Sequence, residues 1–130
     1  MDQVVTGLAA QRAAGRYAEV GLTARTAQAT PYDLVVVLYD ELLLNLDIAL
    51  RAQAADNAVR TRHALTQSML VLRMLDSGLD PAGGGALATT LGGIYRQMLR
   101  HLQGGEPARV AEVRDGVANL ADAWNKLQPA

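Results

Sequence analysis

The stretch from Thr30 to Ala52, TPYDLVVVLYDELLLNLDIALRA, constrains the fold more than any other part of the chain. Thr30 is suited to an N-cap, Pro31 is tolerated in a first helical turn, and Asp33 places negative charge near the positive end of the helix dipole. The stretch therefore predicts a long helix that begins at about residue 31 and runs to about Ala55.

The apolar side chains of this helix are too many for one face. Projected at about 100° per residue, most of them fill one continuous arc slightly wider than half of the circumference, which we expect to face the core. This arc comprises Leu34, Val35, Val36, Leu38, Tyr39, Leu42, Leu43, Leu46, Ala49 and Leu50. A second group, Val37, Leu44 and Ile48, forms a narrow strip outside the arc.

A polar wedge separates the strip from the arc. It contains Asp40, Asp47 and Arg51, and the spacing of the last two predicts an i, i+4 ion pair. The strip has two interpretations: another part of the same chain covers it, or a partner lays an apolar segment on it. Both hold if a loosely held N-terminal segment covers a groove that a partner later occupies.

Length and composition limit the alternatives. The chain has 130 residues, half of them apolar, which is enough for a single core. Its only aromatic residues are four tyrosines and one tryptophan, and the absence of cysteine excludes disulfides and thiolate metal sites and fits a reducing cytoplasm. A net charge of −1 gives no electrostatic basis for binding nucleic acid or an anionic membrane. We expect a soluble protein without a signal peptide or membrane span.

The segments before Thr30 carry weaker patterns. Residues 1–15 are rich in alanine and interrupted by glycine, and we expect a frayed or disordered N-terminus. Residues 16–29 place Tyr17, Val20 and Ala24 on one helical face, while Gly21 and several threonines weaken the helix. This segment is predicted to be a short helix that docks loosely on the bundle. Together with the bundle it forms a single predicted domain of residues 16–128.

Three further helices follow the first. After a turn at Asp56 and Asn57, apolar periodicity predicts helices at about residues 57–78, 86–103 and 106–127, with a loop at 79–85 and a stop at Gly104–Gly105. Helices joined by such short loops must reverse direction at each turn. The predicted fold is an all-α, antiparallel up-down four-helix bundle with no sheet.

The sequence offers little for catalysis. His63 and His101 fall on different helices, and neither has a carboxylate at i+3 or i+4 that would complete a metal-ligand pattern. Three glycines at 83–85 lack the lysine that follows them in a phosphate-binding loop. Arg96, Arg100 and His101 form a small basic patch that we interpret as a solvated face. We predict no enzyme activity, no metal and no cofactor.

Several short motifs, in order, resemble the flagellar export chaperone FliS family. They are Tyr17 to Val20, Ala29 to Pro31 with Leu34, Leu38 to Asp40, Leu79 and Asp80 before a glycine-rich turn, Leu91 with Ile94 and Tyr95, and Ala121 to Trp124. The similarity spans roughly residues 16–128. The chain departs from the family pattern at Glu41, Thr90 and Gln97, where the family often has Gly, Asn and Tyr.

The resemblance implies a cytosolic helical bundle that binds the disordered C-terminal segment of flagellin, prevents early polymerisation and delivers flagellin to the type III export gate. It implies that Tyr17 and Val20 belong to an N-terminal cover and that Leu34, Tyr39 and Tyr95 occupy motif positions. The export-gate protein and a flagellar regulatory protein are further candidate partners.

The candidate client-binding set therefore contains Tyr17, Val20, Leu34, Val37, Tyr39, Leu44, Ile48 and Tyr95. For Leu34 and the tyrosines, packing in the core is an equally good explanation. The alternative function is a self-associating structural bundle, a homodimer without a client. The oligomeric state predicted for the chaperone is a monomer or a weak homodimer.

Overall fold

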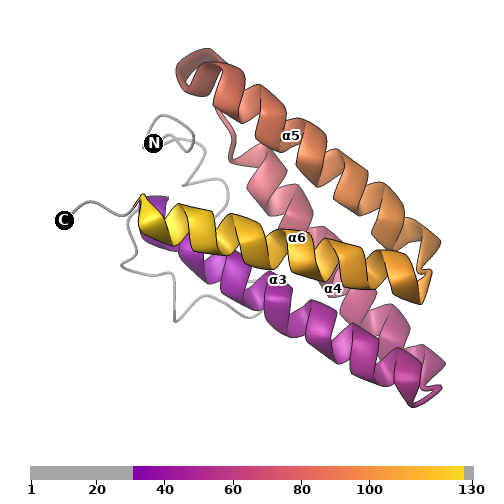
Figure 1. Cartoon of the computed structure of the whole chain (residues 1–130). Helices are drawn as coiled ribbons and strands as arrows, with labels where there is room; N and C mark the ends of the chain where they lie inside the picture. Colours follow the sequence, from indigo (N-terminus) through magenta and orange to yellow (C-terminus); the bar gives the residue numbers. More distant parts are fainter. Residues whose placement is uncertain (1–30, 128–130) are drawn as a thin grey trace.

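The computed structural model describes residues 31–127, and these form four α-helices in an up-down bundle (Figure 1). The helices are α3 (Pro31–Ala54), α4 (Ala58–Ser77), α5 (Pro81–Gly104) and α6 (Pro107–Lys126). No strand occurs in this range. The all-α, antiparallel fold predicted from the sequence is confirmed, while the Thr30 cap and the predictions for residues 1–15 and 16–29 lie outside the described residues.

Local signals set most of the helix ends. Asn57 caps α4, because its side chain accepts a hydrogen bond from the Arg60 backbone N–H at 3.0 Å. Gly105 follows α5 in the left-handed conformation, with φ of 69°, and its N–H donates to the His101 carbonyl. The predicted stop at Gly104–Gly105 is thus confirmed.

The glycine-rich segment at the start of α5 is more helical than predicted. The sequence suggests a loop from Leu79 to Gly85, but the helical segment begins at Pro81 and contains a kink at Gly85, where φ is 58° and ψ is −134°. Asp80 is at the N-cap position, and its carbonyl accepts a hydrogen bond from the Gly84 N–H. Proline in the first turn therefore starts a short helical turn that the glycines interrupt without abolishing.

Each helix packs against two others. The long helix α3 lies between α4 and α6, and α5 also contacts α4 and α6, so α3 and α5 are diagonal across the bundle. Their shared core consists mainly of the predicted α3 arc and of buried apolar side chains from the other three helices. This arrangement leaves one side of α3 facing away from the core.

Tyr32 and Trp124 lock the first turn of α3 to the last turns of α6. Their rings stack with centroids 5.1 Å apart. The Tyr32 hydroxyl donates to the Trp124 carbonyl at 2.5 Å, and the Trp124 indole N–H donates to the Tyr32 carbonyl at 3.4 Å. Trp124 therefore closes the core near the C-terminus.

Candidate functional site

The strip of Val37, Leu44 and Ile48 lies on the outward side of α3. Leu44 is 51% exposed, whereas Leu42, two residues earlier on the core arc, is 0% exposed. Val37 and Ile48 are half-buried and pack against the edge of the core. The strip thus combines one exposed apolar side chain with two that are partly covered.

Acidic side chains border the strip. Asp40 is exposed, and Asp47 forms an ion pair with Arg114 of α6, with the Arg114 Nε 3.0 Å from the Asp47 Oδ1. The predicted i, i+4 pair between Asp47 and Arg51 is therefore wrong. Arg114 reaches Asp47 from the neighbouring helix, and only the pairing of α3 with α6 brings it there.

Glu41 and Asn45 form the other border of the strip. The Asn45 side chain donates to the Glu41 carbonyl at 2.9 Å and to the Glu41 carboxylate at 3.2 Å. These bonds hold two polar side chains along the side of α3 next to the apolar strip.

Three other predicted client-binding residues lie inside the bundle. Leu34, Tyr39 and Tyr95 are all buried, and none presents its side chain at the surface of this structure. The Tyr39 and Tyr95 hydroxyls are 2.6 Å apart and join α3 to α5 across the core. Burial raises the pKa of both phenols above the usual range for tyrosine. Tyr17 and Val20, the remaining members of the set, lie outside the described residues.

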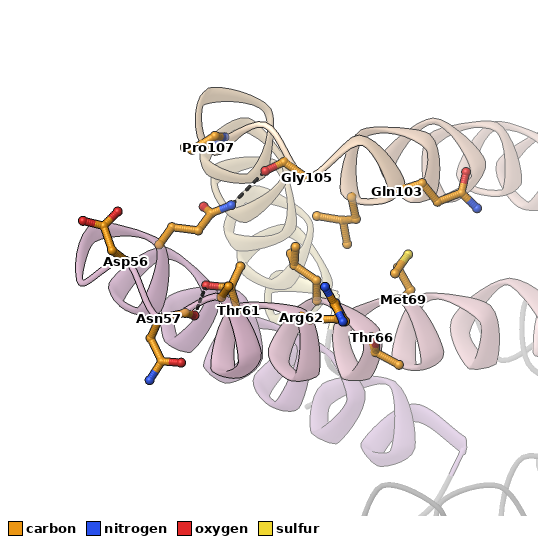
Figure 2. Close-up of a pocket in the computed structure, with 13 residues that line it drawn as sticks. Asp56, Asn57, Thr61, Arg62, Thr66, Met69, Gln103, Gly105 and Pro107 are labelled. Carbon is orange, nitrogen blue, oxygen red and sulfur yellow. Dashed lines mark hydrogen bonds between the residues drawn. The ribbon is translucent and has the colours of Figure 1, made fainter.

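A cavity at one end of the bundle is a feature that sequence reasoning missed (Figure 2). It measures about 540 Å³ and lies where α4 begins and α5 ends, with Leu65, Met69 and Leu102 among its lining residues. Gln53 of α3 also lines it, and the Gln53 amide donates to the Gly105 carbonyl at 2.8 Å. Leu65 and Leu102 are apolar residues within the predicted helices, but no local signal in the sequence shows that a cavity forms between them.

The two histidines of the chain lie apart from any cluster of possible metal ligands in the described residues. His63 is exposed and His101 is half-buried, and no three histidine or acidic side chains between residues 31 and 127 come close enough to hold a metal ion. None of the four helices combines the length and the apolarity that crossing a bilayer requires.

An all-α bundle in which α3 presents apolar side chains on a second, outward side belongs to the class of small helical proteins suited to binding other polypeptides. The family model described as Flagellar protein FliS matches residues 13–130, so the chain belongs to this family. The Flagellar secretion chaperone FliS of Salmonella typhimurium strain LT2 is 28% identical over 118 residues, which cover 87% of each chain. The role that follows for the protein is that of a chaperone in flagellar export.

Proposed function

We propose that the protein binds the C-terminal segment of flagellin in the cytoplasm, prevents its early polymerisation and assists its delivery to the type III export apparatus. The observation that carries this proposal is the outward strip of Val37, Leu44 and Ile48 in a chain of the FliS family. The mechanism is coupled folding and binding, in which a disordered client gains structure as it buries apolar side chains. It requires no catalysis, nucleotide or cofactor.

The exposed area of the strip determines how much free energy it can contribute to client binding. Complete burial of a Val, Leu or Ile side chain contributes about 1.5 to 3 kcal/mol. Leu44 is 51% exposed, and Val37 and Ile48 are less exposed. Burial of the part of these three side chains that is still exposed can therefore contribute on the order of 3 kcal/mol to client binding. A micromolar complex requires about 8 kcal/mol, so the strip acts as one anchor within a larger contact.

The other residues predicted to bind the client divide into two groups. Tyr17 and Val20 remain candidates for a cover that the client displaces. Leu34, Tyr39 and Tyr95 are buried, and we propose that they act by holding α3 and α5 in place beneath the client surface. The export-gate protein and a flagellar regulatory protein remain proposed partners.

Calorimetry with a synthetic peptide of the flagellin C-terminus tests the proposal. We expect binding at micromolar concentration, accompanied by a gain of helicity in circular dichroism. Replacing Val37, Leu44 and Ile48 by serine should weaken binding while the thermal unfolding transition of the bundle remains cooperative. Absence of binding to the unmodified protein would contradict the proposal, and loss of the folded state in the variant would assign the strip to the core.

Sedimentation distinguishes client binding from the alternative of a structural homodimer. The exposed Leu44 side chain could also meet its equivalent in a second copy. A client-binding surface predicts a monomer that forms a complex with the peptide, whereas a dimer that persists in the presence of peptide would favour self-association.

A further inference from the structure

The seam between α4 and α5 contains two cavities that the strip on α3 does not share. The first is the cavity at the end of the bundle, with Leu65 and Met69 of α4 and Leu102 of α5 as its apolar lining (Figure 2). The seam is therefore open and partly apolar where α4 begins.

The second cavity lies further along the same seam. It measures about 380 Å³, and Asp76 and Leu79 line it from the α4 side while Gly92 and Arg96 line it from α5. A Cβ atom at Gly92 would lie 3.1 Å from an Arg96 guanidinium nitrogen and 3.5 Å from Leu79 Cδ1. Glycine at this position thus keeps the seam open, because a larger side chain would fill it.

The two cavities together define the length of an occupant. Arg62 lines the first cavity and Asp76 the second, and they are 14 positions apart on the same helix, which corresponds to about 21 Å. A helical segment of about 14 to 16 residues could contact both.

Charge distinguishes this seam from the α3 side of the bundle. The helices α4 and α5 together carry five arginines, at positions 60, 62, 73, 96 and 100, and one carboxylate, Asp76. In α3 the balance is reversed, with four carboxylates and Arg51 as the one basic residue. The two sides of the protein therefore present opposite charge.

Most of this positive charge is available to a partner. Arg96 pairs with Asp76 across the seam at 3.6 Å, but Arg62, Arg73 and Arg100 are exposed and form no ion pair within residues 31–127. Arg73 lies one turn beyond Met69, and Arg100 lies one turn beyond Arg96, so helical geometry places them along the seam.

Gln53, which lines the first cavity, also carries a buried polar atom without a hydrogen-bond partner among the described residues. The Gln53 amide nitrogen donates to the Gly105 carbonyl, which fixes the orientation of the amide. Its Oε1 atom is buried and accepts no hydrogen bond from the described residues.

We propose that the α4–α5 seam is a second docking surface, which binds an acidic, amphipathic helical segment of a protein partner other than the client. Apolar side chains of this segment occupy the two cavities, its carboxylates face Arg62, Arg73 and Arg100, and the seam is used while the strip on α3 remains free for the client. Opposite charges on the two sides direct different segments to each.

A synthetic 16-residue peptide tests the proposal on the full chain. The peptide carries leucine at every third or fourth position and glutamate on both flanks, and a second peptide has lysine in place of each glutamate. Fluorescence anisotropy measures their affinity. We expect the acidic peptide to bind more tightly than the basic one and to lose affinity as salt is raised.

Charge reversal locates the contact. The double variant Arg62→Glu/Arg73→Glu should bind the acidic peptide about tenfold or more weakly, because each change replaces an attraction by a repulsion. Arg60→Glu is the matched control: Arg60 lies on the same helix, is exposed and points away from the seam by helical spacing, so we expect less than about a twofold effect. Circular dichroism verifies that both variants fold.

Four outcomes would overturn the proposal. The first two are that the acidic peptide does not bind and that the acidic and basic peptides bind with equal affinity. The third is that Arg60→Glu loses as much affinity for the acidic peptide as the double variant does. The fourth is that Arg62 and Arg73 bind phosphatidylglycerol vesicles instead of the peptide. Competition with the flagellin peptide provides a separate criterion. Simultaneous binding supports two surfaces, and mutual displacement contradicts them.

Discussion

The buried pair of Tyr39 and Tyr95 allows a sharp test of how the bundle is held together. Their hydroxyls are 2.6 Å apart and connect two helices that lie diagonally across the core. Replacing either tyrosine by phenylalanine preserves the ring and removes one hydroxyl. The remaining hydroxyl then stays buried without its partner.

The expected magnitudes follow from this geometry. A buried polar group that loses its partner costs about 1 to 3 kcal/mol, whereas removing both partners together can be nearly neutral. Tyr39→Phe and Tyr95→Phe should each lower the free energy of unfolding by about 1 to 3 kcal/mol. The free energy of unfolding of the double variant should be no lower than that of the less stable single variant.

Urea unfolding provides the assay, monitored both by circular dichroism and by the fluorescence of Trp124, the one tryptophan of the chain. Agreement of the two probes justifies a two-state treatment. Tyr32→Phe is the control, because its hydroxyl bonds to a backbone carbonyl and shares no hydrogen bond with Tyr95, so its effect should add to that of Tyr95→Phe. Additive losses in the Tyr39/Tyr95 double variant, or neutral single variants, would refute the reasoning.

Three further predictions concern stability. Leu42→Ala should lower the free energy of unfolding by about 2 to 5 kcal/mol and Leu44→Ala by less than about 1 kcal/mol, as urea titrations would show; equal losses would place Leu44 in the core. Gly105→Ala should destabilise by about 1 kcal/mol because φ is positive there, while Gly104→Ala should not, and thermal unfolding of the two variants compares them directly. Because burial raises the pKa of Tyr95, the native state retains this proton at a pH at which the unfolded chain releases it. The contribution of Tyr95 to stability should therefore be constant below about pH 10 and decline above it, and Tyr95→Phe should make the decline of stability less steep by about 1.4 kcal/mol per pH unit. An unchanged slope would argue against burial of the phenol.

The helices could be predicted because their signals are local. Asn57, Gly105 and Pro107 mark helix ends through their own backbone and side-chain chemistry, whatever packs against them. The division of α3 into an arc and a strip also follows from helical spacing alone. The burial of Leu42 and the exposure of Leu44 confirm that division at these two positions.

Features that depend on which helices pack together could not be predicted. Asp47 pairs with Arg114 because α6 lies beside α3, and spacing along α3 suggested Arg51 instead. Tyr39 and Tyr95 are 56 positions apart, so their motifs show that both matter without showing that they bond to each other. The basic seam likewise exists only because α4 lies beside α5, which combines arginines that appear as unrelated surface charges in the sequence.

The central claim is that the strip on α3 binds the client, and a matched pair of leucine variants tests it most directly. Leu44 is 51% exposed on the strip, and Leu87 is 39% exposed on α5, away from it. Calorimetric titration of the flagellin C-terminal peptide into Leu44→Gln and Leu87→Gln compares the same substitution at two exposed sites. We predict that Leu44→Gln binds the peptide about tenfold more weakly, because it loses apolar burial and places a polar amide in an apolar contact. Binding by Leu87→Gln should be unchanged. Unchanged binding in a folded Leu44→Gln protein, or equal losses in both variants, would contradict the claim.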